Sequence, residues 1–192
     1  LIALLVVVGL LLIFFFTFQG MYNNMVTMEE ATTGQWANVE TAYQRRADLI
    51  PNLVNTVKGY ADFEQETLTQ VIEARSKATS INVDANDINP QQLQQFQEAQ
   101  SQLSGALSRL LVTVERYPEL MANQNFLQLQ SQLEGTENRI AIERRKFNDI
   151  VRNYNTYIRK FPQSIISGIT GFDKKGYFES EAGSEEAPEV QF

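Results

Sequence analysis

The sequence predicts an all-α protein in which an N-terminal transmembrane helix is followed by a long antiparallel four-helix bundle. Two observations support this fold class. Residues 1–18 contain no charged side chain, and as a helix rising about 1.5 Å per residue they would span roughly 27 Å, close to the hydrocarbon core of a bilayer. The rest of the chain repeats apolar residues at spacings of three and four, which is typical of amphipathic helices in a bundle.

The apolar run is predicted to be a retained membrane anchor at residues 1–20. A secretory signal peptide has a shorter apolar core and a small-x-small exit, whereas this run ends in the sequence TFQGMY. The alternative, a buried core helix, would need a large soluble domain around it. Residues 19–44 carry no Lys or Arg. Because basic residues favour the cytoplasmic side of a span, we expect the body of the protein outside the cytoplasm.

The bundle is predicted for residues 21–162 and is built from four helical segments. The first continues from the anchor to Ile50, since Pro51 restricts the residue before it and suits the first position of a new helix. The three further helices are expected at residues 51–80, 90–117 and 125–161. The last of them keeps a nearly heptad spacing of apolar residues, which favours packing at shallow angles.

The stretch INVDANDINP is predicted to be a turn-rich loop that caps the next helix. Asn89, Pro90 and Gln92 have the spacing of an N-cap, a proline at the first helical position and a capping-box glutamine. A calcium loop is the alternative, but the EF-hand spacing needs a glycine at its sixth position and a glutamate at its twelfth, and neither is present. A second cap is expected at Asn125 with Gln128.

Polar residues interrupt the apolar stripes of two predicted helices. Thr136 and Glu143 do so in the fourth helix, and Arg46 does so near the end of the first. We expect these three residues to form a polar layer inside the bundle, with a buried or half-buried Arg46–Glu143 pair, because polar atoms there need partners. A layer that sets helix register is favoured over a ligand site. Residues that could join it are Arg45, Glu137, Asn138 and Arg139.

Composition argues against an enzyme. The chain has no His and no Cys, so it lacks the commonest general base, the commonest transition-metal ligand, and any thiolate or disulfide. No glycine-rich phosphate loop is present. The formal net charge is −7, which argues against nucleic acid as a partner. We therefore expect no catalytic residue, no cofactor and no metal.

Two segments follow the predicted bundle. Residues 163–178 are expected to form a turn or short segment that packs on the bundle. Residues 179–192 are acidic and lack apolar periodicity, which predicts disorder, although the ending PEVQF could dock on an envelope protein partner. Aromatic residues gather towards this end of the chain, where core packing is the default interpretation and a patch for a partner or the membrane interface is the alternative.

Methionines just beyond the anchor favour a homo-oligomer. Met21, Met25 and Met28 share one face near Trp36, and no partner helix within one chain is evident for that face. Flexible Met side chains are common at adaptable interfaces, so we expect chains to meet along residues 21–36. The anchor itself offers no GxxxG seam for close helix crossing.

Several motifs together resemble the LemA family. RRADLIPNLVNTVKGYA and TENRIAIERRKFND form a specific combination, and further pieces follow in the right order. These pieces are YNNMV (22–26), WANVETAYQRRADLIPNLVNTVKGYADFEQETL (36–68), VIEARSKA (71–78), YPEL (117–120), LQSQLEGTENRIAIERRKFNDIVRNYN (129–155) and FPQSIISGITGF (161–172). The family often has Tyr where this chain has Phe147. The resemblance implies an N-terminally anchored bacterial membrane protein with a long antiparallel helical bundle, and it implies no enzyme activity, cofactor or established binding residue.

The sequence therefore predicts a non-enzymatic, membrane-anchored helical scaffold or interaction protein of the bacterial cell envelope, which forms homo-oligomers. Its expected location is the inner (cytoplasmic) membrane, crossed once, with the lipid bilayer as a partner and the body on the periplasmic side. The alternative function is a sensory or ligand-binding helical bundle at the membrane. That alternative would call for a second span leading to an output domain, and we find one span.

Overall fold

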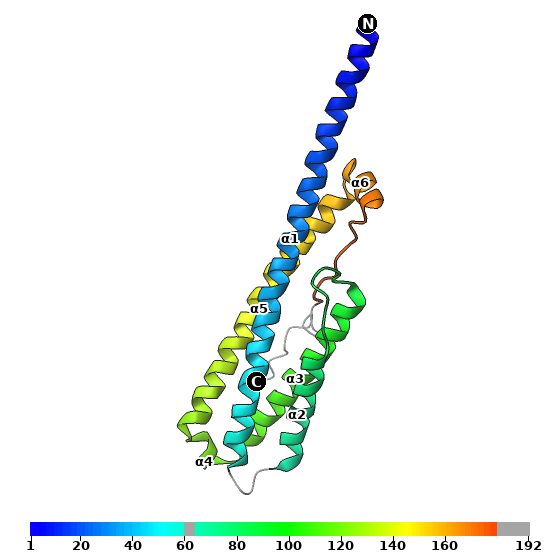
Figure 1. Cartoon of the computed structure of the whole chain (residues 1–192). Coiled ribbons are helices and arrows are strands. Elements are labelled where there is room, and N and C mark those ends of the chain that lie inside the picture. Colours follow the sequence, from blue (N-terminus) through cyan, green and yellow to red (C-terminus); the bar gives the residue numbers. More distant parts are fainter. Residues whose placement is uncertain (60–63, 180–192) are drawn as a thin grey trace, which may run out of the picture.

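The computed structural model describes residues 1–59 and 64–179, and over these residues the chain is helical and contains no strand. The all-α class and the long apolar N-terminal helix are confirmed (Figure 1). The helices of this part of the chain are α1 (Ile2–Lys58), α2 (Gln65–Ser80), α3 (Pro90–Val114), α4 (Pro118–Met121), α5 (Gln124–Arg159) and α6 (Gln163–Thr170). Apart from Glu179, the predicted acidic tail lies outside the described residues.

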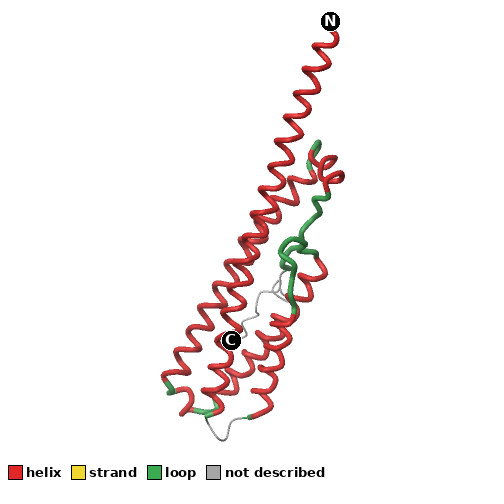
Figure 2. Tube along the Cα trace, in the orientation of Figure 1, coloured by secondary structure: helices red, strands yellow, loops and turns green. Residues whose placement is uncertain are grey.

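The four long helices α1, α2, α3 and α5 lie side by side, and successive ones run in opposite directions (Figures 1 and 2). Helix α1 pairs with α5, and α2 pairs with α3. The N-terminal part of α1 extends beyond all other described segments, and the window with the apolar character of a membrane span is unburied. Apolar side chains form three clusters along the bundle, around Leu53, Trp36 and Met25.

Helix α1 does not break at Pro51, so the predicted boundary there is wrong. A proline inside a helix removes the hydrogen bond to the carbonyl four residues earlier, which here belongs to Ala47. In the folded chain Arg75 of α2 donates its Nε–H to that carbonyl oxygen at 2.8 Å. A tertiary donor thus replaces the missing backbone donor, and α1 continues to Lys58.

The caps agree with the prediction in part at α3 and differ at α5. The Asn89 side chain accepts a hydrogen bond from the backbone N–H of Gln92 at 2.9 Å, with Pro90 at the first helical position of α3. The capping-box contact of Gln92 is not formed, because its side-chain oxygen is buried without a hydrogen-bond partner among the described residues. At α5 the cap is Asn123 rather than Asn125. The chain leaves α3 at Val114 and forms the short α4 first, which brings the Asn123 side chain to the free amides that open α5.

The buried stripe of α5 changes position along the helix. As predicted from the heptad spacing, it includes Phe126, Leu133, Ile140, Phe147 and Tyr154. Towards the end of the helix, Val151 and Ile158 are buried, whereas Phe161, which the same spacing predicts to be buried, is 81% exposed. A straight α-helix has 3.6 residues per turn, so a strict seven-residue repeat drifts away from the core over this length.

After α6 the chain turns back at Gly171 and runs extended along the bundle, and three side-chain amides hold residues 175–179 there. Each amide donates its N–H to a backbone carbonyl and accepts the backbone N–H of the same residue, at 2.8–3.1 Å. The pairs are Asn155 with Lys175, Asn148 with Phe178, and Gln97 with Glu179. The backbone groups of Lys175, Phe178 and Glu179 thus find hydrogen-bond partners without a neighbouring strand.

The Arg75–Ala47 hydrogen bond can be tested with a double-mutant cycle. Arg75→Met should lower the free energy of unfolding by about 1–3 kcal/mol, because the Ala47 carbonyl loses its donor. In a Pro51→Ala background the restored backbone N–H can donate to that carbonyl, so the same substitution should cost less. Urea unfolding of the four chains measures the coupling. An equal loss in both backgrounds would show that Arg75 does not act through Ala47.

Candidate functional site

Arg46 is buried, with 2% of its surface exposed, and it links three helices. One terminal nitrogen donates to Ser104 Oγ at 2.7 Å and forms an ion pair with Glu137 Oε2 at 2.8 Å. The other donates to Gln100 at its side-chain oxygen, at 2.7 Å, and at its backbone oxygen, at 3.2 Å. The guanidinium also lies 5.2 Å from the centre of the Tyr43 ring. Partners on α3 and α5 therefore compensate most of the positive charge of the Arg46 guanidinium.

Glu143 is also buried but has different partners. The Gln35 amide of α1 donates to its Oε2 at 2.8 Å, while Arg139 Nε and Lys146 Nζ lie 2.9 and 3.3 Å from its Oε1. The Gln35 hydrogen bond is the main cause that holds the pKa of Glu143 below its ordinary value. Burial opposes this shift, and Lys146 adds to it. The carboxylate is thus ionised inside the bundle.

The expected Arg46–Glu143 pair is not formed. The antiparallel packing of α1 on α5 places Arg46 opposite Glu137, and Glu143 lies six residues, about 9 Å, farther along α5. Thr136 is buried as well, yet its hydroxyl donates to the Gln132 carbonyl of its own helix at 2.8 Å. The three predicted residues are therefore all inside the bundle but belong to separate networks.

A further buried charge, Lys175, was missed by the sequence reasoning. Its ammonium donates to the Asn86 carbonyl at 2.6 Å and pairs with Glu29 at 2.8 Å. No periodicity marks Lys175, because it lies in the extended segment after α6. The sequence does mark one member of the Arg46 network, because Gln100 interrupts the apolar stripe of α3.

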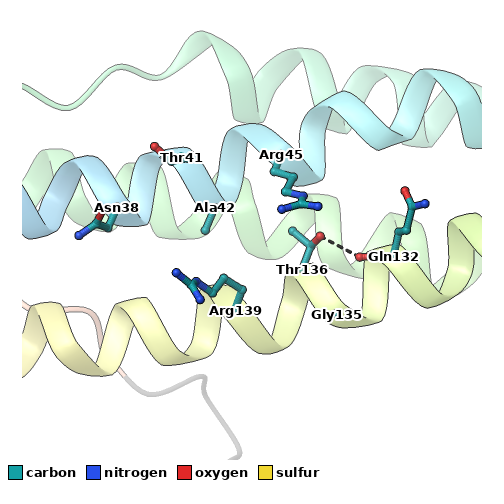
Figure 3. A pocket seen from close by; sticks show the side chains of 8 residues that line it. All are labelled: Asn38, Thr41, Ala42, Arg45, Gln132, Gly135, Thr136 and Arg139. Carbon is teal, nitrogen blue, oxygen red and sulfur yellow. Dashed lines mark hydrogen bonds between the residues drawn. The ribbon is translucent and has the colours of Figure 1, made fainter.

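An open groove of about 500 Å³ runs between α1 and α5 (Figure 3). Arg45 from α1 and Arg139 from α5 reach into the space between the helices, and none of the described residues that line it is acidic. The remaining lining residues are Asn38, Thr41, Ala42, Gln132, Gly135 and Thr136. Two guanidinium groups with amide and hydroxyl neighbours are suited to an anionic group. In the described part of the chain no group of three or more His, Cys, Asp or Glu could hold a metal ion.

The methionine face expected at an oligomer interface is largely covered within the chain. Met25 and Trp36 are 0% and 1% exposed, and Met21 and Met28 are partly buried in the same cluster as Met25. The covering side chains are Tyr154 and Ile158 from the end of α5, Ile166 from α6, and Phe172 from the segment directly after α6. The sequence reasoning found no intrachain partner because α6 folds back from far along the chain.

Comparison with known proteins gives one family and a few relatives. Residues 35–192 match the LemA family. Protein LemA of Metamycoplasma hominis is 28% identical over 112 residues, which cover 58% of this chain and 48% of that protein. Magnetosome protein MamQ 1 of Paramagnetospirillum magneticum is 28% identical over 179 residues, covering 82% and 64%. Magnetosome protein MamQ of Magnetospirillum gryphiswaldense is 28% identical over 178 residues, covering 82% and 64%.

This chain therefore spans about half the length of the first relative and less than two thirds of the others. None of these names denotes an enzymatic activity.

The Glu143 network predicts a pH-dependent stability. Glu143→Gln should lower the free energy of unfolding at pH 7 by about 1–3 kcal/mol, because the charged acceptor for Gln35 is lost. A lowered folded pKa contributes stability above the unfolded value, near 4.5, and loses it as the pH falls through the folded value. The difference in free energy of unfolding between the unmutated chain and Glu143→Gln should therefore disappear below about pH 4.5. Thermal unfolding from pH 7 to pH 3 measures it.

Glu98→Gln on the exposed face of α3 is the matched control and should shift stability by less than about 0.5 kcal/mol at all pH values. A pH-independent gap for Glu143→Gln would contradict the assigned charge.

Proposed function

The chain belongs to the LemA family, and on that premise we propose that it is a non-enzymatic, membrane-anchored helical scaffold of the bacterial cell envelope. The observation that carries this proposal is the continuity of α1. Its N-terminal part carries an 18-residue apolar window with no buried residue, and the same helix then enters the core of the bundle. A single helix thus connects the membrane segment to the folded body.

Because α1 is continuous, it fixes how far the body extends from the bilayer. The 40 residues of α1 from Gln19 to Lys58 rise about 60 Å at 1.5 Å per residue. An interruption of the helix at the membrane surface would leave the body free to reorient, whereas an unbroken helix packed against α5 does not. This geometry supports a role as a spacer or platform that presents a surface at a set distance from the bilayer.

The buried charges support a structural role for the polar layers. Arg46, Glu143 and Lys175 each contact partners from this chain at 2.6–3.3 Å. A catalytic acid or base has to reach a substrate, usually from a cleft, and these groups are instead committed to helix packing. The layers therefore serve register and orientation of the helices.

Association of copies is part of the proposal. Since Met25 is covered by α5 and α6, copies would meet through the outward face of the juxtamembrane part of α1. Exposed residues on that face include Asn23, Thr27 and Ala31. Periplasmic orientation in the inner membrane is likewise proposed, from the lack of basic residues between residues 19 and 44. The acidic tail is proposed as a docking segment for an envelope partner.

Ligand binding is the second candidate function, and the groove of Figure 3 favours it. Arg45 and Arg139 would face a small anionic molecule between α1 and α5. We rank this function second because Arg139 Nε already pairs with Glu143 at 2.9 Å, which reduces the positive charge available to a ligand.

Membrane orientation can be tested with one cysteine, because the chain has none of its own. Ser80→Cys is exposed at the end of α2 and should react with a membrane-impermeant maleimide once the outer envelope is opened. Phe16→Cys, within the anchor, is the matched control and should stay unlabelled. Reaction of Ser80→Cys only after lysis of the inner membrane would place the body in the cytoplasm.

Association can be tested by cysteine crosslinking in native membranes. Thr27→Cys on the outward face should form disulfide-linked dimers on mild oxidation, because copies would approach through that face. Met25→Cys, two residues away but buried within the chain, should not. Electrophoresis without reductant reads both variants. Crosslinking at Met25 instead, or at neither position, would contradict the proposed interface.

A further inference from the structure

Helix α6 carries apolar side chains that nothing in the described chain covers. Phe161, two residues before the helix, is 81% exposed, and Ile165 and Ile169, one turn apart on it, are 55% and 74% exposed. We call these three residues the apolar ridge. The neighbouring Ile166 is buried against α1 and α5. Helix α6 therefore has one apolar side that faces the bundle and a second apolar side that faces outward.

The ridge lies at the membrane end of the bundle. The cluster that holds α6 includes Met25 and Phe172 and, partly buried, Phe18 and Met21. The Tyr22 and Phe172 rings are 5.6 Å apart. In Figure 1, α6 sits where the free N-terminal part of α1 leaves the bundle. Since the apolar run ends at Phe18, a bilayer crossed by residues 1–18 has its surface within about one or two helical turns of α6.

Basic side chains accompany the ridge. Arg159 and Lys160, both exposed, directly precede Phe161, and Lys174 follows α6 beside one acidic neighbour, Asp173. Basic residues next to an exposed apolar helix face are typical of helices that lie in the interface of membranes with anionic lipids. Charge and apolar surface thus occur together at the end of the molecule that faces the bilayer.

We propose that α6 is an interfacial membrane-binding helix. The apolar ridge enters the boundary between headgroups and acyl chains of the same bilayer that α1 crosses, and Arg159 and Lys160 contact anionic phospholipid headgroups. This inference rests on the membrane anchoring in the proposed function and adds a second contact to it. With two contacts, rotation of the body about the axis of α1 is restricted, so one face of the bundle is held towards the membrane.

A lipid surface fits the ridge better than a protein partner does. A stable protein interface buries about 800 Å² on each partner, and three side chains expose far less than that. Insertion into lipid needs no complementary surface, and it continues the apolar surface that α1 already presents to the bilayer.

The test uses the full chain in vesicles of phosphatidylcholine and phosphatidylglycerol, with single cysteines that carry a nitroxide spin label. Ile169→Cys reports on the ridge, Phe16→Cys on the anchor, and Val112→Cys, at a position 63% exposed at the far end of α3, on the aqueous phase. Collision rates with oxygen and with a water-soluble nickel chelate measure depth. The oxygen-to-nickel ratio at Ile169→Cys should exceed that at Val112→Cys several-fold and stay below that at Phe16→Cys.

The outcomes separate this inference from the proposed function. If the oxygen-to-nickel ratio at Ile169→Cys equals that of the aqueous position Val112→Cys while the ratio at Phe16→Cys is that of a site within lipid, the interfacial helix alone is overturned. An aqueous ratio at Phe16→Cys overturns the anchor and with it the proposed function. Spin–spin broadening between chains at Ile169→Cys would show that a second copy covers the ridge, which also overturns the inference.

A charge-matched comparison tests the basic residues. Arg159→Gln with Lys160→Gln should lower the oxygen-to-nickel ratio at Ile169→Cys, because attraction to anionic headgroups is weakened. Arg109→Gln with Arg145→Gln removes the same charge from exposed positions elsewhere and should leave the ratio unchanged. Equal effects of the two pairs would contradict headgroup contact by Arg159 and Lys160.

Discussion

The Trp36 side chain joins the separate parts of this fold. Its indole ring lies 5.4 Å from the ring of Phe96 on α3 and 5.6 Å from that of Phe147 on α5, both edge-on, and it stacks on Phe178 of the returning segment at 6.0 Å. Such ring pairs contribute about 0.5–1.5 kcal/mol each beyond the burial of their area. Since α1 pairs with α5 and α2 pairs with α3, this cluster is where the two helix pairs and the C-terminal segment meet.

Two polar networks accompany the Trp36 cluster. Gln35, next to Trp36 on α1, donates to Glu143, and Arg46 binds partners on α3 and α5. Apolar packing alone tolerates sliding of one helix along another, whereas a buried charge that moves by one turn loses its partners. The amide pairs of Asn148 and Asn155 act in the same way on the returning segment, because they hold Phe178 against Trp36.

The continuity of α1 links these core contacts to the candidate membrane span. A helix that ended at Pro51 would still carry Trp36 but would lose the packing of Leu53 and Val57 in the apolar cluster around Leu53. Arg75 makes the unbroken helix possible by donating to the carbonyl that proline leaves free. At the other end, α6 packs around Met25, so the helix is clamped directly beyond the segment that fits a bilayer. The segment that fits a bilayer and the packing of the core therefore belong to one helix.

Patterns of residues close together in the sequence were enough to predict part of this structure. The unbroken apolar run predicted the long N-terminal helix that fits a bilayer, periodicity predicted the helices, and the Asn89–Pro90 pair predicted the start of α3, since all of these depend on neighbours a few residues away. Burial of Arg46, Thr136 and Glu143 also followed from their places in apolar stripes. The tertiary structure alone decided which partner each charge takes, because the offset between antiparallel α1 and α5 is set by the whole interface. It also decided that α1 passes through Pro51 and that α6 covers Met25, because the Arg75 donor and the covering side chains come from segments distant in the sequence.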